Sequence, residues 1–133
     1  MNLNQVTLPS ADVRRSVEFY VRMGLIQIVE DLPHYARFEC PDGDATLSVE
    51  KVDRLPGSPG AVVYFECENF DSAVARIRER GVQFDSEPRN QPWLWREAYL
   101  KDPDGNVICL FEAGENRKNP PWRLGSESRS GRG

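Results

Sequence analysis

The sequence predicts an α+β fold made of two tandem modules, each a strand, a helix and three further strands. Residues 10–25 align with residues 67–82 at an offset of 57 positions, and residues 41–50 align with residues 103–112 at an offset of 62. A strand-like run, LNQVTL or AVVYFE, precedes the first match in each copy. Such an internal repeat indicates one supersecondary unit used twice.

The first helix is indicated by apolar residues at helical spacing, namely Val13, Val17, Tyr20 and Val21. Ser10 or Asp12 is expected to cap its start, because short polar side chains accept hydrogen bonds from the first free backbone N–H groups. Gly24 follows the periodic stretch, where a left-handed terminating residue is needed.

The second helix repeats this pattern with Phe70, Val74 and Ile77. Asn69 or Asp71 is expected to cap it, and Gly81 stands at the equivalent terminating position.

Three strands are predicted after each helix, the last two joined by a Pro-Asp-Gly turn. YARFEC precedes the first such turn and EAYLK the second. We therefore expect a single domain over residues 1–114, with module one at 1–53, a Pro- and Gly-rich linker at 52–60 and module two at 61–114. Residues 115–133 are expected to form a partly flexible tail. Each half is too small to be stable alone.

Composition and charge narrow the class of partner. The net charge is −4, and residues 116–133 hold five basic residues and one acidic residue, so the body is more acidic still. An acidic body disfavours nucleic acid, no apolar run is long enough for a membrane helix, and no signal peptide is recognisable. The predicted location is cytoplasmic.

Three cysteines without CxxC spacing indicate neither a disulfide framework nor a zinc knuckle.

The chain resembles members of the vicinal oxygen chelate superfamily in its order of elements. A strand, a helix and three strands occur twice, with a PDG turn before each last strand. The pieces LNQVTLPSADVRRSVEFYVRMGL and REAYLKDPDGNVICLFE carry the resemblance. The second piece is most similar to bleomycin-resistance-like and glyoxalase-like members. The resemblance implies a cupped mixed β-sheet with helices on the convex side, a small-molecule pocket in the concavity, and a homodimer.

The resemblance also places four metal-ligand positions, at Gln5, Ser48, Val62 and Cys109. Val62 has no lone pair to donate to a metal ion. Cys109 could bind as a thiolate, but a soft sulfur ligand suits zinc better than the harder divalent ions that enzymes of this superfamily often use. We therefore expect no cofactor. The alternative is a divalent metal held in an altered site by Gln5 with Glu50 or Glu66.

Strand alternation indicates which side chains share the cup. The segment from Trp93 to Tyr99 is predicted as a strand with Trp93, Trp95, Glu97 and Tyr99 on one face. Aromatic rings with a few polar groups suit a flat ligand, although packing in a core or a dimer interface is the alternative. The candidate ligand-binding residues are Gln5, Thr7, Ser48, Glu50, Tyr64, Glu66, Trp95, Glu97, Tyr99 and Cys109.

Three functions follow in order of preference. The first is metal-independent binding or sequestration of a small molecule, of the bleomycin-resistance type. The second is a glyoxalase-like lyase or isomerase that uses the altered divalent site. The third is a structural or regulatory interaction domain, since fold alone does not fix function. The sequence identifies no catalytic residue; His34, the one histidine, is expected on the surface or at a pocket rim.

Overall fold

The computed structural model describes residues 1–57 and 60–125. Module one consists of β1 (Gln5–Ser10), α1 (Val13–Met23), β2 (Ile26–Asp31), β3 (Tyr35–Glu39) and β4 (Thr46–Lys51). Module two consists of β5 (Val62–Glu66), α2 (Phe70–Glu79), β6 (Arg89–Asn90), β7 (Arg96–Lys101) and β8 (Val107–Glu112), followed by the short 3-10 helix η1 (Gly114–Asn116). The predicted order of strand, helix and three strands is confirmed in both modules.

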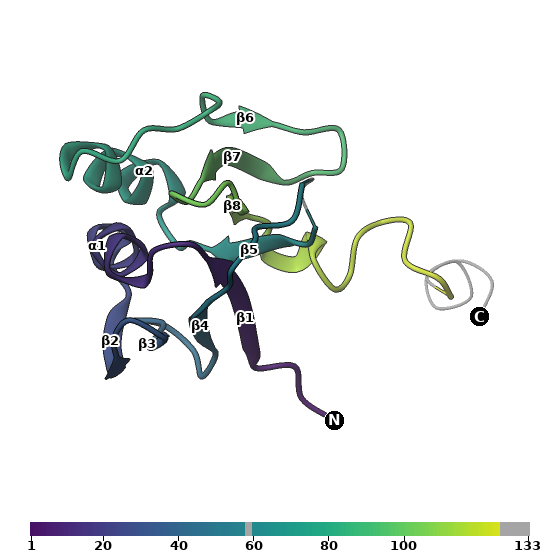
Figure 1. Cartoon of the computed structure of the whole chain (residues 1–133). Helices are drawn as coiled ribbons and strands as arrows, with labels where there is room; N and C mark the ends of the chain where they lie inside the picture. Colours follow the sequence, from purple (N-terminus) through teal and green to yellow (C-terminus); the bar gives the residue numbers. More distant parts are fainter. Residues whose placement is uncertain (58–59, 126–133) are drawn as a thin grey trace.

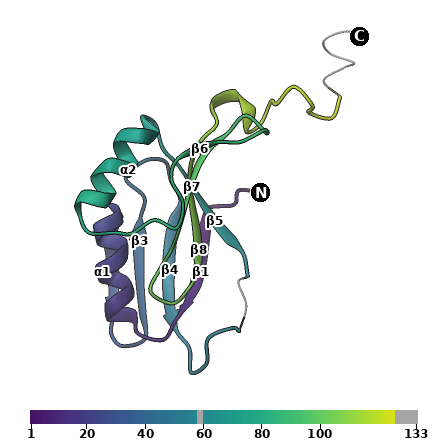
Figure 2. The same cartoon turned by 90° about the horizontal axis from the view of Figure 1, so that it is seen from above.

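Each module forms its own four-stranded mixed sheet, in the order β1-β4-β3-β2 or β5-β8-β7-β6. The first strand pairs in parallel with the last, Gln5 opposite Thr46 and Val62 opposite Val107, and the remaining pairs are antiparallel. Helices α1 and α2 lie side by side on one side of the sheets (Figures 1 and 2). The α+β class and the tandem modules are thus as predicted, and the strands form two four-stranded sheets.

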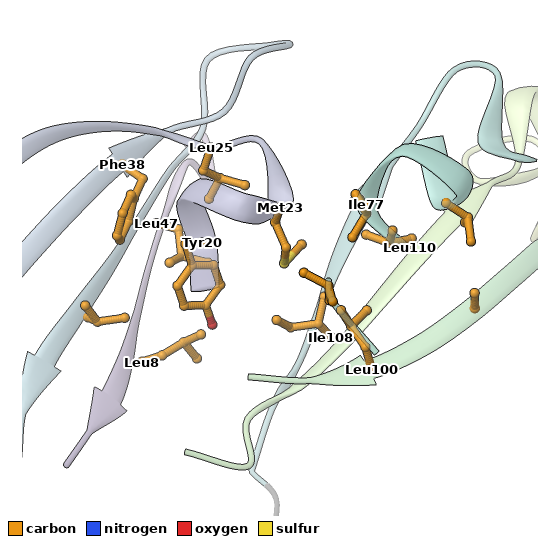
Figure 3. Packing of buried hydrophobic residues seen from close by; sticks show 14 of the residues in the cluster. Leu8, Tyr20, Met23, Leu25, Phe38, Leu47, Ile77, Leu100, Ile108 and Leu110 are labelled. Atoms are coloured by element: carbon orange, nitrogen blue, oxygen red, sulfur yellow. The ribbon is translucent and has the colours of Figure 1, made fainter. Parts of the chain in front are cut away.

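One hydrophobic cluster spans the junction between the modules. It combines buried residues of module one, such as Tyr20 and Met23, with residues of module two, such as Ile77 and Ile108. Figure 3 shows these side chains converging from both sheets and from α1 and α2. Because both halves bury their apolar faces in the same core, neither half has to be stable alone.

The helix ends agree with the sequence in part. Asp12 caps α1 by accepting a hydrogen bond from the backbone N of Arg15 at 3.2 Å, and Gly24 ends it with a φ of 108°. Val21, however, is 49% exposed. The buried face of α1 also includes Ser16, which takes a place that the apolar pattern had assigned elsewhere.

The start of α2 is capped from outside the helix. Asn69 stands at the N-cap position, but its side chain makes no capping hydrogen bond. The Glu112 carboxylate at the end of β8 instead accepts from the backbone N of Phe70 at 3.1 Å. Gly81 follows the C-cap residue Arg80 and has a φ of 90°, the left-handed conformation that the sequence predicts.

The predicted strand from Trp93 to Tyr99 begins too early. Trp93 lies in a turn, Leu94 has a positive φ of 68°, and β7 begins only at Arg96. The Gln91 N–H donates to the Trp95 carbonyl at 2.7 Å, which closes the loop before the strand. Trp93 therefore reaches the sheet face from a turn.

Two predicted segments fall partly outside the described residues. The linker over 52–60 includes residues 58–59, and the flexible tail over 115–133 includes residues 126–133. Within the described part of that tail, Trp122 is 57% exposed.

Neither of the two described helices is long and apolar enough to cross a membrane.

The DPDGN turn of module two fastens the modules together at one end of the junction. The Asp102 carboxylate accepts a hydrogen bond from the buried Tyr20 hydroxyl at 2.6 Å. The Asp104 side chain, 0% exposed, accepts from the backbone N of Ala11, from Arg15 and from Ser16 at 2.9–3.0 Å. We call this set of contacts the inter-module clasp.

The buried Asp102 carboxylate holds several further hydrogen bonds at the clasp. Asp102 also accepts from the backbone N–H groups of Asp104 and Asn106 and from the Asn106 side chain, at 2.8–2.9 Å. Burial, then the charge and hydrogen bond of Asp102, raise the pKa of Tyr20. The phenol therefore stays protonated and donates. The motif that carries the family resemblance thus has a structural role in this chain.

Candidate functional site

The candidate site lies on the helix-free faces of the two sheets. We define the module-one face by six side chains, Gln5, Thr7, Tyr35, Arg37, Ser48 and Glu50, which alternate with core residues along β1, β3 and β4. We define the module-two face by Tyr64, Trp95, Glu97, Tyr99, Cys109 and Phe111, which come from β5, β7, β8 and the residue before β7.

A chain of hydrogen bonds joins the centre of the module-one face. Gln5 Nε2 donates to Ser48 Oγ at 2.6 Å, and Ser48 Oγ lies 2.5 Å from Tyr35 Oη. Arg37 Nε donates to Tyr35 Oη at 2.9 Å. The other end of the Gln5 amide accepts from the Thr46 hydroxyl. Ser48 is 0% exposed, so this chain fixes a buried hydroxyl beneath a polar surface.

The pKa of Tyr35 is shifted in the opposite direction to those of Tyr20 and Tyr99. Partial burial acts to raise the pKa of its phenol, but the hydrogen bonds from Ser48 and Arg37 and the Arg37 charge outweigh this effect. The pKa of Tyr35 consequently lies below its ordinary value, although the Glu50 charge opposes the shift. A hydroxyl in such surroundings is a better proton donor than an ordinary phenol.

Three aromatic rings form a wall on the module-two face. Trp95 stacks on Phe111 with ring centroids 4.4 Å apart and an interplanar angle of 16°. The Tyr64 ring meets both edge-on, at 5.9 Å from Trp95 and 5.7 Å from Phe111. Tyr64 is 46% exposed, so the wall has an accessible rim. We call this group the aromatic wall.

Glu97 lies beside the wall with an unfilled hydrogen-bonding capacity. It is 2% exposed, and its Oε2 accepts from Trp93 Nε1 at 2.9 Å. Its Oε1 is buried and has no hydrogen-bond partner among the described residues. Leaving a buried polar atom unpaired costs about 1–3 kcal/mol. A donor from a water molecule or from a ligand would remove this cost.

Tyr99 and Cys109 adjoin Glu97, and both stay protonated at neutral pH. Burial, a hydrogen bond to Tyr64 and nearby groups raise the pKa of Tyr99. Burial and the Glu97 charge raise the pKa of Cys109 to about 12. At the other end of β5, burial and then the Asp42 charge raise the pKa of Cys67 to about 11.

We expect Cys109 to resist alkylation in the native protein. With a pKa of about 12, only about one thiol in ten thousand is ionised at pH 8, and the thiolate is the reactive form. Mass spectrometry after iodoacetamide treatment at pH 8 should show slow labelling of Cys109 in folded protein and rapid labelling in urea. Equal rates in the two conditions would contradict the burial described here.

The metal-ligand positions implied by the resemblance do not fit a divalent ion. Gln5 is a neutral amide whose oxygen and nitrogen are both engaged, and Ser48 is bonded to Gln5 and Tyr35. Val62 offers no donor atom, and Cys109 remains a thiol because its pKa is raised. Within residues 1–57 and 60–125, no three His, Cys, Asp or Glu residues are grouped to hold a metal ion.

A cavity lies at the junction of the modules, at the end opposite the clasp. It measures about 480 Å³ and includes Cys40, Asp42, Cys67 and Ile77 in its lining. By the internal repeat these residues correspond to Asp102, Asp104, Ser10 and Tyr20, the centre of the clasp and its surroundings. Ile77 and Cys40 cannot form the hydrogen bond that joins Tyr20 to Asp102 in the clasp, and this end of the junction is open.

The cavity and the aromatic wall share Tyr64, but they differ in chemistry. The cavity lining mixes Glu66, Glu68 and Asp42 with Arg76 and Arg80, without an evident preference for one charge. The wall combines stacked rings with an unpaired buried oxygen. Stacked rings and an unpaired oxygen specify the kind of ligand more closely than the volume of a cavity does. We therefore place the candidate site on the sheet faces.

The sequence-predicted residues fall into two separate groups. Gln5 donates hydrogen bonds to both Thr7 and Ser48, and Glu50 lies exposed on the same face. Tyr64, Trp95, Glu97, Tyr99 and Cys109 come together on the other face. Among the described residues, no hydrogen bond, ion pair or ring contact joins the two groups.

Glu66 and His34 belong to neither group. Glu66 carries a carboxylate 3.4 Å from Arg117 Nε, and it lines the junction cavity. His34 is exposed in the turn before β3, as expected of a surface histidine. The Glu66 carboxylate that an altered metal site would need is thus engaged by a cation.

Sequence reasoning missed Tyr35, Arg37 and Phe111. The first two alternate with the buried Ala36 and Phe38 in YARFEC, and that alternation is visible in the sequence. Their proximity to Ser48 depends on the antiparallel register of β3 and β4, in which Arg37 lies opposite Ser48. Phe111 likewise gains its role only through stacking on Trp95.

Comparison with known proteins places this arrangement in a family. The family model described as the Glyoxalase/Bleomycin resistance protein/Dioxygenase superfamily matches residues 2–110. The uncharacterized protein YraH of Bacillus subtilis (strain 168) is 28% identical over 128 residues, which cover 84% of this chain and 98% of YraH.

Two solved structures have a similar fold. A glyoxalase/bleomycin resistance protein/dioxygenase from Nocardioides is 26% identical, with a TM-score of 0.71 over 85% of this chain and 83% of its own. A bleomycin-binding protein, solved in complex with bleomycin, is 22% identical, with a TM-score of 0.69 over 84% of this chain and 98% of its own. The second likeness concerns the fold alone. Together with the family match, the two modules show that this chain belongs to the glyoxalase/bleomycin resistance protein/dioxygenase superfamily.

Proposed function

We propose that this protein binds a small planar molecule on the module-two face without the help of a metal ion. The observation that carries the proposal is the aromatic wall beside the unpaired Oε1 of Glu97. Ligand sites commonly combine broad apolar and aromatic contact with a few polar groups that fix orientation. A ring stacked against Trp95, with an N–H or O–H directed at Glu97, meets both conditions.

The family match and the donor chemistry support binding without metal. One relative of the same fold was solved as a bleomycin-binding protein in complex with bleomycin. In this chain, the side chains at the implied metal positions are neutral or already engaged. A glyoxalase-like lyase or isomerase with an altered divalent site has less support, because Glu66 is ion-paired with Arg117 and the Gln5 amide is engaged by Ser48 and Thr46.

A homodimer is part of the proposal. Strands β1, β2, β5 and β6 stand at sheet edges, where unpaired backbone groups favour association. On the edge strand β2, Ile26 and Ile28 are 48% and 47% exposed. Apolar side chains on an open strand edge are typical of a surface that another chain covers.

We expect Trp95→Ala to weaken the binding of a neutral planar probe by about tenfold, as loss of a central aromatic contact commonly does. Nile red fluorescence, titrated with the full chain, measures this. Trp122→Ala is the matched control, because Trp122 is 57% exposed and outside the aromatic wall. Equal affinities in the two variants would refute the aromatic site.

The absence of a metal requirement is tested on the same protein. Nile red affinity should be unchanged after treatment with a chelator, and elemental analysis should give less than one divalent ion per chain. Stoichiometric metal that is lost on Gln5→Ala, together with chelator-sensitive binding, would favour the lyase alternative.

A further inference from the structure

The module-one face presents a polar network whose donors are not all used within the protein. Arg37 is half-buried at the centre of β3, with its Nε bonded to Tyr35 Oη at 2.9 Å and its guanidinium carbon 5.5 Å from the Tyr35 ring centroid. Within residues 1–57 and 60–125, neither Nη group of Arg37 has a hydrogen-bond or ion-pair partner. The guanidinium is thus held in place while one edge of it stays free.

The direction of the hydrogen bonds adds a further free donor. Ser48 Oγ accepts from Gln5 and is fully buried, so the Ser48 proton needs an acceptor. Tyr35 Oη, 2.5 Å away, is the acceptor at hand. Tyr35 Oη then accepts from both Ser48 and Arg37, and its own proton is left to be donated outward.

A guanidinium edge and a hydroxyl proton together match a carboxylate. The two Nη groups are suited to bidentate pairing with carboxylate oxygens, which adds geometric specificity to charge attraction. Tyr35 Oη adds the third donor beside this edge, because it already accepts from Ser48 and from Arg37 Nε. Glu50, exposed on the same face, acts against an anion.

We propose that Arg37 and Tyr35 form a binding site for a small carboxylate anion on the module-one face, in the place where the resemblance implies half of a metal site. The Arg37 guanidinium, held by its hydrogen bond to Tyr35, supplies the positive charge that a metal ion would supply in the implied site. The site does not depend on the aromatic wall, and its failure would leave the proposed function untouched.

The test compares benzoate with benzamide, which has the same shape without the charge, by calorimetric titration of the full chain. Benzoate should bind at least about tenfold more tightly than benzamide, since a hydrogen-bonded charge contributes that much. Arg37→Gln should abolish this preference, and Tyr35→Phe should reduce it. Glu50→Gln should strengthen benzoate binding, because it removes an opposing charge.

Arg14→Gln is the matched control, since it changes the net charge equally at an exposed residue of α1. Unfolding curves and retained Nile red binding show that Arg37→Gln is folded. Equal losses in the Arg37 and Arg14 variants would mean general charge attraction and would overturn the proposal. So would equal affinities for benzoate and benzamide, or no benzoate binding at millimolar concentration.

Discussion

Replacing Asp102 with alanine is expected to lower the free energy of unfolding by about 3–5 kcal/mol, the cost typical of breaking a buried charged network. The carboxylate accepts hydrogen bonds from Tyr20, Asn106 and two backbone N–H groups. Its removal leaves a buried phenol and these donors unpaired. Because whole-domain stability is only about 5–15 kcal/mol, urea unfolding should show a large loss.

Tyr20→Phe tests the same contact with less disturbance, since it removes one hydroxyl from a fully buried ring. We expect a loss of about 1.5–3 kcal/mol, the contribution of a hydrogen bond to a charged group. This variant remains informative if Asp102→Ala does not fold.

The internal repeat provides a matched control for the clasp. Asp42 is the counterpart of Asp104 but is exposed, and no hydrogen bond to its side chain occurs in the described part of the chain. Asp42→Ala should therefore change stability by less than about 0.5 kcal/mol, as surface substitutions usually do. Asp104→Ala is the variant to compare with it. Equal losses of stability in Asp42→Ala and Asp104→Ala would mean that the two ends of the junction are equivalent, and the contrast between the clasp and the open cavity would be wrong.

Replacing Glu97 with methionine is expected to stabilise the free protein by about 1–3 kcal/mol, because it removes a buried oxygen without a partner. The unbranched side chain of methionine has a similar length and fills irregular space. Trp93 loses its acceptor, but it is 43% exposed and water can replace the bond. Thermal unfolding should show a higher midpoint, and ligands that donate to Glu97 should bind less tightly.

Glu39→Met is the control for this change. Glu39 is an exposed carboxylate on β3, and no side-chain hydrogen bond to it is found among the described residues. Its replacement should leave the midpoint almost unchanged. A lower midpoint for Glu97→Met would show that the carboxyl group stabilises the fold, and the interpretation of Glu97 as a ligand-facing group would be withdrawn.

Much of the fold could be predicted because its determinants are local. The helical spacing of Val13, Val17 and Tyr20, the glycine at position 24 and the two PDG turns are short-range patterns that repeat in both modules. The start of β7 could not be placed, because alternation continues through Trp93 and Trp95 while the backbone turns at Leu94. The turn is closed by the backbone bond from Gln91 to Trp95, which alternation does not encode.

The sequence predicts that the candidate side chains share one concave face of a single sheet. In the structure they form two groups, one on each sheet. Strand alternation correctly put Gln5 with Thr7 and Glu97 with Tyr99, because side-chain direction follows from position along a strand. Whether Arg37 stands beside Ser48 depends on the register between β3 and β4. Whether Glu97 finds a second hydrogen-bond partner depends on the packing around it.

By itself the sequence determined the class of the fold, the two modules and the face on which most candidate side chains lie, since these depend on periodicity along the chain. Only the tertiary structure decided that Tyr20 meets Asp102 while the equivalent Ile77 and Cys40 border an open cavity. Contacts between residues far apart in the chain depend on how two complete modules pack. A repeated pattern is compatible with either a closed or an open junction until that packing is known.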